Sequence, residues 1–376
     1  MNIGMMKSLD AVIGRLAAKL LARPGMKAKP YPIDTILLIR PGGIGDAVHL
    51  IPAINAIKAA YPDAVIDILA QKRNSAIFRL STNVRHVFRY DRLCDLFQVL
   101  RTTYDVVIDT EQWHRLSAVV ARMTRAPMLI GYDTNERARL FTHKAPYSQD
   151  DYEIESFFRL LEPLCIEPRE VSRPFLAVPN EATQRGDALL GELKGRAFVT
   201  IFPGASIPER QWGADKFGKV AEMLAVLGVA VVVVGSGDDK GQGEMIVAGT
   251  AGLNLAGRTS LSETAAVIQK SVLLLSGDSG VLHIAMGLGV PTVSLFGPGR
   301  AGKWAPRGER HIVINKGLSC SPCTTFGTTP PCPISAQCLN DITVDEVFNA
   351  VAVLLTATGG LSSACCKKEW IEISNV

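Results

Sequence analysis

The sequence predicts an α/β protein made of two doubly wound domains, each a parallel sheet with helices on both faces. Continuous apolar runs typical of buried parallel strands alternate with helical segments. This alternation occurs twice along the 376 residues, a length that suits two domains. Glycine-bearing loops follow the expected strands, and the carboxyl ends of strands are where open α/β sheets bind ligands.

The first series of elements follows a linker marked by Pro30 and Pro32. Residues 45–62 have helical periodicity that stops at Pro62, and we expect a helix there. Strands are expected at residues 35–40, 64–70, 104–110 and 128–133. We therefore expect a first domain over residues 31–178, preceded by a leader helix within residues 1–30.

The second series starts after Pro179 and Asn180 interrupt the pattern. Strands are expected at residues 197–202, 229–235, 272–277 and 291–297, and a helix at 281–289. A closing helix is expected within residues 342–355, with Thr343 as its N-cap. The second domain is thus expected over residues 179–358, followed by a polar tail, residues 359–376.

Composition and charge restrict the classes of partner. Hydrophobic residues make up 47% of the chain and charged residues 20%, so large cores can form. The net charge of +4 suits anionic ligands or a membrane surface. The sequence has no basic stripe interleaved with aromatic residues, so nucleic acid is a disfavoured partner. No apolar run reaches the ~18 residues of a spanning helix, and no signal peptide is evident, so we expect a cytoplasmic protein.

The leader combines apolar and basic residues at helical spacing. Its apolar positions are Leu9, Val12, Ile13, Leu16 and Leu20, and its basic positions are Lys7, Arg15, Lys19 and Arg23. A basic amphipathic helix can lie on anionic lipid, and it can equally pack on its own protein. Both interpretations stay open at this point, the first implying peripheral association with a membrane.

The loop "IRPGGIGDAVHL", residues 39–50, begins like a dinucleotide-binding turn. Gly43 and Gly45 fit that pattern, but Val48 stands where the third glycine belongs. Helix N-terminal amides attract anions, and Asp46 already supplies one. Its carboxylate would repel a phosphate, so the dinucleotide interpretation is disfavoured.

Two roles are open for Asp46. It can be a simple N-cap, or an ionised carboxylate that accepts a proton from a substrate hydroxyl. Gly43 and Gly45 would let such a substrate approach closely. His49, one turn further on, could orient the substrate or simply be structural.

Three loops of the second domain suit a nucleotide diphosphate. In "SGDSGVLHIA", Ser279 and Gly280 start a helix whose amides could bind an anion, while Asp278 could bind sugar hydroxyls or cap the helix, and His283 could reach the same ligand. The loop "PGASIPERQW" offers Ser206 as a donor and Arg210 as a diphosphate clamp. An acidic residue in "GSGDD", residues 235–239, could hold ribose hydroxyls.

Four cysteines occur in a short segment with the spacing C-x2-C-x8-C-x5-C, namely Cys320, Cys323, Cys332 and Cys338. Four thiolates could bind structural zinc or iron. The second half departs from the usual C-x2-C spacing, so reduced thiols or one disulfide remain alternatives.

With these segments in hand, the chain resembles the ADP-heptose:lipopolysaccharide heptosyltransferases, glycosyltransferase family 9, from about Thr35 to Leu355. The carrying segments are "ILLIRPGGIGDAVHLIPAINAIKAAYP", "IFPGASIPERQW", "NLAGRTSL" and "GDSGVLHIAMGLGVPTVSLFGP". The resemblance implies a GT-B fold, two Rossmann-like domains facing a cleft, with acceptor on the first and nucleotide sugar on the second. It also implies inverting transfer that needs no metal cofactor.

The resemblance assigns roles to individual residues. Asp46 matches the family's catalytic base, and Arg210 replaces a lysine in the diphosphate loop that also contains Ser206. Asp238 is the expected ribose-binding acid, with Asp239 as the next choice. The donor-sugar and diphosphate motif matches Asp278, Ser279, Gly280 and His283.

The resemblance also implies the partners. The donor would be ADP-heptose, and the acceptor the inner core of lipopolysaccharide, a Kdo- or heptose-bearing lipid A, on the cytoplasmic face of the inner membrane. Arg137 and Arg139 would suit this anionic lipid, although plain surface charge explains them as well. Alternatives are a GT-B enzyme using another nucleotide sugar, such as a UDP-sugar, and a non-catalytic sugar-nucleotide-binding protein.

Overall fold

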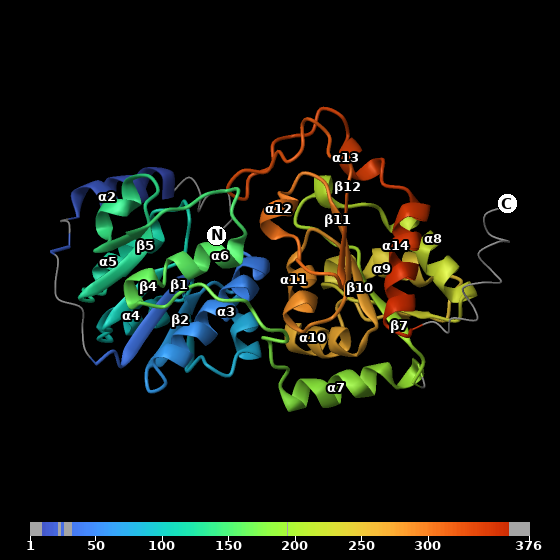
Figure 1. Ribbon diagram of the computed structural model, residues 1–376, viewed down its shortest axis with the longest axis horizontal. Coiled ribbons are helices and arrows are strands. Elements are labelled where there is room, and N and C mark those ends of the chain that lie inside the picture. The colour runs from blue at the N-terminus through green and yellow to red at the C-terminus, as the bar shows by residue number, and fades with distance from the viewer. Residues whose placement is uncertain (1–9, 22–23, 26–31, 194, 361–376) are drawn as a thin grey trace. The chain divides into compact units, whose positions relative to one another are not determined.

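The computed structural model describes residues 10–21, 24–25, 32–193 and 195–360 (Figure 1). The chain divides into two compact units between Phe175 and Leu176. The N-terminal unit and the C-terminal unit each contain one six-stranded parallel sheet with helices against it. The predicted α/β fold is therefore confirmed, while the functional limits 31–178 and 179–358 stay predictions.

The sheet of the N-terminal unit has the strand order β3-β2-β1-β4-β5-β6. Chain order reverses beside β1, so β1 and β4 are neighbours at the point where a doubly wound sheet binds ligands. The strands are β1 (Thr35–Arg40), β2 (Val65–Ala70), β3 (His86–Arg89), β4 (Val106–Asp109), β5 (Met128–Tyr132) and β6 (His143–Ala145).

Helices cover this sheet and connect its strands. The expected helix after β1 is α3 (Ile44–Ala60), and it continues through Pro52. The others are α2 (Arg15–Leu20), α4 (Leu93–Arg101), α5 (Leu116–Met123) and α6 (Glu153–Arg159), with a π-helical turn at Asp10–Gly14 and 3-10 turns at Ser75–Leu80, Glu136–Leu140 and Glu162–Leu164. Strands β3 and β6 were not predicted, because they are short strands toward the two edges and carry polar residues.

The C-terminal unit repeats the plan with the strand order β12-β11-β10-β7-β8-β9, so β7 and β10 are the neighbours at its reversal. Its strands are β7 (Phe198–Phe202), β8 (Ala230–Val233), β9 (Leu253–Asn254), β10 (Leu273–Gly277), β11 (Thr292–Phe296) and β12 (His311–Asn315). Four of these lie where the apolar runs predicted them. The exceptions are β9, only two residues long, and β12, whose residues are only partly buried.

The helices of this unit are α7 (Asn180–Leu190), α8 (Ala214–Val226), α9 (Lys240–Val247), α10 (Leu261–Lys270), α11 (Gly280–Gly287), α12 (Ala301–Trp304), α13 (Gln337–Asn340) and α14 (Val344–Ala357), with 3-10 turns at Gly191–Leu193, Pro208–Arg210 and Gly237–Asp239. Thr343 caps α14 as predicted, since its hydroxyl accepts from the amide of Glu346 at 3.2 Å. In the described part of the chain, no helix combines the length and apolarity needed to cross a bilayer.

In the described part of the predicted leader, the π-helical turn is followed by α2, and both pack on the N-terminal unit, while the leader limits 1–30 stay a prediction. Asp10 accepts hydrogen bonds at 2.7 Å from the amides of Arg115 and Leu116, at the start of α5. Burial would raise the pKa of Asp10, but hydrogen bonds from His114 and from these amides outweigh it and hold the pKa below its ordinary value. Leader residues 1–9, 22–23 and 26–30, and tail residues 361–376, lie outside the described residues.

Candidate functional site

The loop after β1 joins the strand to α3 and fixes Asp46 in the first turn of that helix. One carboxylate oxygen, Oδ2, accepts from the amide of Gly43 at 3.2 Å. The other, Oδ1, lies 3.4 Å from Nη2 of Arg40, the last residue of β1. Asp46 therefore caps its helix and is also held by an ion pair, while its side chain stays 21% exposed.

The glycines of this loop make room for Arg40 and Asp46. Gly42 has a φ of +123°, and a Cβ there would lie 2.8 Å from Nη2 of Arg40. A Cβ on Gly43 would lie 2.8 Å from Oδ2 of Asp46. Gly45 occupies the first turn of α3 beside Asp46. Any larger residue at 42 or 43 would displace the ion pair.

Arg40 is buried and holds two carboxylates. Its Nε donates to the carbonyl of Pro41 and its Nη1 to that of Thr110, both at 2.7 Å, and its Nη2 lies 3.5 Å from Oε2 of Glu111. Burial alone would lower the pKa of Arg40, but Asp46 and Glu111 raise it above its ordinary value. Burial would raise the pKa of Glu111, and Arg40 reverses this and holds it low. The loops after β1 and β4 thus share one charge network.

The loop after β2 supports this arrangement. Gln71 accepts from the amide of Gly42 at 3.3 Å, and the buried Asn74 donates to the carbonyl of Arg40 at 3.0 Å. Arg73 lies in the same loop, where its positive charge interacts with Asp46 and Glu111. An exposed cation close to Asp46 would suit an anionic ligand.

Two residues expected to bind the acceptor are buried instead. His49 is fully buried on α3, with its ring 5.7 Å from that of Tyr152. Arg137 is also fully buried, with Nη2 2.6 Å from Asp109 and its guanidinium over Phe141. The expectations of surface charge and of an acceptor contact at Arg137 are therefore wrong. An orienting role for His49 is likewise not supported, because the ring has no surface to offer a ligand.

In the C-terminal unit, Arg210 and Asp278 form one ion pair. Nη1 of Arg210 lies 3.1 Å from Oδ2 of Asp278, and Nη2 donates to Thr324 at 3.3 Å. Nε of Arg210 has no hydrogen-bond partner among the described residues. A Cβ on Gly299 would come within 2.0 Å of Oδ2 of Asp278, so this glycine leaves the space that the carboxylate fills.

The start of α11 has the strand-turn-helix form that the sequence predicted. Ser279 is the N-cap, since its hydroxyl accepts from the amide of Leu282 at 3.2 Å, and Gly280 begins the helix. His283 is buried near Trp304, with ring centroids 6.2 Å apart. Burial lowers the pKa of His283 to about 3, so its imidazole is neutral at physiological pH.

The remaining donor-loop residues differ in their surroundings. Ser206 and Asp238 are exposed. Asp239 instead accepts from both the amide and the hydroxyl of Ser236 at 2.7 Å, and a Cβ on Gly204 would lie 2.3 Å from its Oδ1. Asp239, rather than Asp238, therefore lies against the loop that follows β7.

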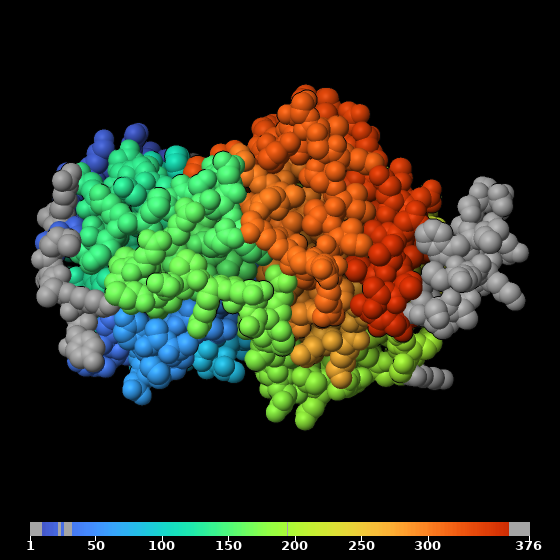
Figure 2. Space-filling model, in the orientation of Figure 1, coloured from blue at the N-terminus to red at the C-terminus, as the bar shows by residue number. Residues whose placement is uncertain are grey.

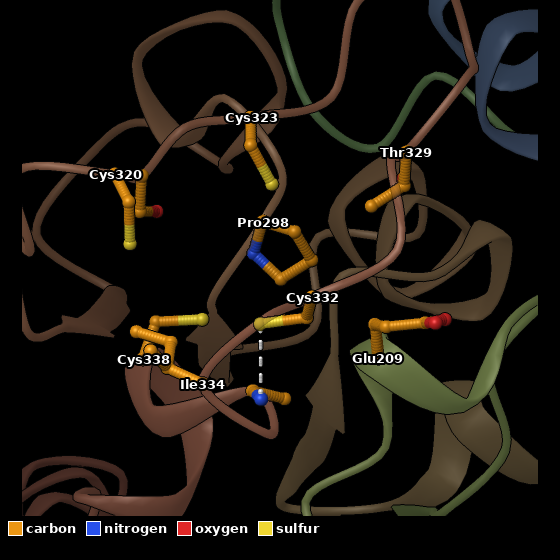
Figure 3. A pocket seen from close by; sticks show the side chains of 10 residues that line it. Glu209, Pro298, Cys320, Cys323, Thr329, Cys332, Ile334 and Cys338 are labelled. Carbon is orange, nitrogen blue, oxygen red and sulfur yellow. Dashed lines mark hydrogen bonds between the residues drawn. The ribbon is translucent and has the colours of Figure 1, made fainter.

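The four clustered cysteines line one small pocket together with Glu209 and Pro298 (Figure 3). All four are free thiols, and Cys332 accepts a hydrogen bond from the amide of Ala336 at 3.2 Å. Within the described ranges, no group of three or more His, Cys, Asp or Glu side chains is arranged to hold a metal ion. The predicted zinc or iron at Cys320, Cys323, Cys332 and Cys338 is therefore not supported.

Comparison with known proteins decides the family. The sequence model of the family "Glycosyltransferase family 9 (heptosyltransferase)" matches residues 93–332, which is more than half of the chain. The chain belongs to glycosyltransferase family 9. Lipopolysaccharide heptosyltransferase 3 of Escherichia coli is 28% identical over 296 residues, covering 71% of this chain and 85% of that protein. Lipooligosaccharide heptosyltransferase 2 of Haemophilus influenzae is 26% identical, covering 74% and 88% respectively.

Solved structures of the family share the fold of this glycosyltransferase. A family 9 glycosyltransferase from Veillonella parvula has a TM-score of 0.74 at 18% identity, covering 88% of this chain and 99% of that one. The ADP-heptose heptosyltransferase II of E. coli has a TM-score of 0.71 at 23% identity, covering 86% and 99%. The GT-B class expected from the sequence is therefore confirmed.

Several residues of this glycosyltransferase's site were not predicted. Arg40 and Glu111 end or follow buried strands, and a charged residue in that position was a signal that could have drawn attention to them. Arg73 carried no comparable signal, because a lysine and an arginine in a polar loop are common. The pairing of Arg210 with Asp278 joins residues 68 positions apart, and spacing alone does not predict it.

Proposed function

We propose that this enzyme transfers a heptose from ADP-heptose to the inner core of lipopolysaccharide, a Kdo- or heptose-bearing lipid A, with inversion at the anomeric carbon. Membership of family 9 and the Arg40–Asp46 arrangement at the start of α3 support the proposal. The curated relatives are named for lipopolysaccharide or lipooligosaccharide heptosyl transfer. A related E. coli structure is described as heptosyltransferase WaaC with ADP.

Asp46 would act as the general base. It would take the proton from an acceptor hydroxyl while that oxygen attacks the anomeric carbon, and the bond from this carbon to the diphosphate oxygen breaks. Of the two carboxylates beside Arg40, Asp46 is the more exposed, with 21% of its side chain accessible against 7% for Glu111. Arg40 would keep the Asp46 carboxylate aimed toward the acceptor.

Arg210 would stabilise the departing diphosphate of ADP. Its Nε has no hydrogen-bond partner among the described residues, which leaves it a donor for a phosphate oxygen. Asp278, paired with Arg210, would bind hydroxyls of the donor sugar, and the amides at the start of α11 after Ser279 and Gly280 would add positive potential. We propose that the acidic pair Asp238 and Asp239 binds the ribose. We also propose that the hydroxyl of Ser206 donates a further hydrogen bond to the diphosphate.

A turnover assay tests the function. We expect ADP release, and an acceptor heavier by one heptose, when the enzyme receives ADP-heptose with a Kdo-bearing lipid A. A parallel reaction with a UDP-sugar tests the alternative donor and should release no UDP. The proposal is wrong if ADP-heptose gives no transfer to any inner-core acceptor while another nucleotide sugar does.

Replacing the diphosphate clamp should weaken donor binding. We expect Arg210→Met to reduce the affinity for ADP by about 10- to 100-fold, because one or two hydrogen bonds to a charged phosphate are lost. Isothermal titration calorimetry with ADP measures this, and Arg185→Met, an exposed arginine on α7, is the matched control. Equal ADP affinity in Arg210→Met and wild type would remove Arg210 from the donor site.

Because the proposed acceptor is a lipid, the reaction would take place at a membrane surface. We propose that the enzyme associates peripherally with the cytoplasmic face of the inner membrane, where its acceptor would lie.

A further inference from the structure

The leader helix presents its apolar residues to solvent. Val12, Ile13, Leu16 and Leu20 are 62%, 51%, 55% and 83% exposed. An amphipathic helix that packs on its own domain normally turns such residues inward. Here the inward positions are Asp10, Gly14 and Ala18 instead, and these are small or hydrogen-bonded. Figure 2 shows the leader (blue, upper left of the view) at the molecular surface.

Specific contacts fix this orientation. Asp10 caps α5, and Arg15 on α2 donates from Nε to Glu136 at 2.6 Å. A Cβ on Gly14 would lie 3.2 Å from Cβ of Arg115, so the helix sits close against the unit at that point. Ala18 belongs to the same core cluster as residues of α4 and α5. Rotating α2 to bury its apolar side would break these contacts, so the apolar side stays outside.

The leader sequence carries an excess of positive charge, although Arg15 is paired with Glu136. Residues 1–31 contain one acidic residue, Asp10, which is buried, and six basic residues, which are Lys7, Arg15, Lys19, Arg23, Lys27 and Lys29. Helix α5, which packs against the leader, has no acidic residue and ends with Arg122 and the exposed Met123. An apolar stripe flanked by cations matches the boundary of an anionic bilayer.

We propose that the outer face of the leader, formed by Val12, Ile13, Leu16, Leu20 and Lys19, binds an anionic lipid surface. The four apolar side chains enter the boundary between headgroups and acyl chains, and Lys19 faces the lipid phosphates. A second copy of the chain fits this face poorly, because pairing two leaders would bring like charges together. The inference deepens the proposed function, since it names the surface that would bring the enzyme to a lipid acceptor.

Vesicle flotation of the full-length protein tests the proposal. We expect binding to vesicles of phosphatidylglycerol and phosphatidylcholine, weak binding to phosphatidylcholine alone, and release by salt. Leu16→Ser combined with Leu20→Ser should lower the partition coefficient by about tenfold or more, because two apolar side chains no longer enter the bilayer. Val226→Ser, which changes an exposed apolar residue of the C-terminal unit, is the matched control and should bind like wild type.

Further measurements distinguish a wrong proposal from a variant that has lost its fold or its transferase activity. The double variant should keep the thermal midpoint of wild type and its ADP release with a delipidated, water-soluble acceptor, since both leucines are exposed. If the wild-type enzyme transfers no heptose, the proposed function is wrong. If it transfers heptose normally but does not float with the vesicles, only the proposal that the leader binds lipid is wrong. Flotation unchanged by the two serines, or a double variant that dissociates a wild-type dimer in sedimentation, overturns the proposal.

Discussion

Asp46→Asn should lower kcat for heptosyl transfer by about a thousandfold, the middle of the range for losing a general base. The amide of asparagine can still accept the hydrogen bond from Gly43, so the helix cap survives. It cannot take a proton from the acceptor hydroxyl. ADP release at saturating donor and acceptor measures the loss, and calorimetry should show nearly unchanged affinity for ADP.

A second carboxylate makes this prediction selective. Glu111→Gln also removes a negative charge beside Arg40, but its buried side chain should matter less for the reaction, with kcat reduced less than tenfold. If Glu111→Gln loses more activity than Asp46→Asn, the base is Glu111 and the assignment of Asp46 is wrong.

Arg137→Met should destabilise the N-terminal unit by about 3–5 kcal/mol, because it leaves Asp109 as an uncompensated buried charge. Asp109 ends β4, next to the loop that carries Glu111, and its Oδ1 accepts from the amide of Glu111 at 3.1 Å. Thermal unfolding followed by circular dichroism should show a midpoint lower by about 10 °C for a unit of this size.

A double replacement distinguishes the ion pair from packing at Arg137. Asp109→Leu with Arg137→Met removes both charges and should recover much of the lost stability, since buried ion pairs often exchange for apolar residues at little cost. Arg139→Met, on the same 3-10 turn, should change the midpoint much less. A double variant no more stable than Arg137→Met would show that the pair is not the cause.

The fold could be predicted from the sequence because its central strands are continuous apolar runs. The segment "AVVV" of β8, for example, is buried on both faces. A continuous apolar run of this kind is typical of a central parallel strand and does not fit a strand with one face in solvent. The strands β3, β9 and β12 carry too few buried residues for that signal, since their place at or toward the edge of a sheet leaves them partly exposed. Their pairing depends on neighbours that are distant in the sequence.

The site was predictable where one loop supplies both the backbone and the functional group. The glycines and Asp46 lie within a few residues, and their spacing already suggested a capped helix beside an open loop. Arg137 shows the limit, because its apparent place in a charged surface segment gave no sign of a partner 28 residues earlier. Burial of a charge depends on the fold of the whole unit.

The loop after β1 also defines which positions an engineer can vary. Four residues of this loop depend on one another, because a neighbouring charged side chain occupies the position where each glycine would otherwise carry a Cβ. They are Arg40, Gly42, Gly43 and Asp46. The pattern R-x-G-G-x-x-D is therefore one structural unit, because replacing any one of these residues disturbs the ion pair between Arg40 and Asp46. Libraries that aim at new acceptors should hold these four residues constant, together with Gln71 and Asn74, which hydrogen-bond to their backbone, and diversify Arg73, whose charge acts on Asp46.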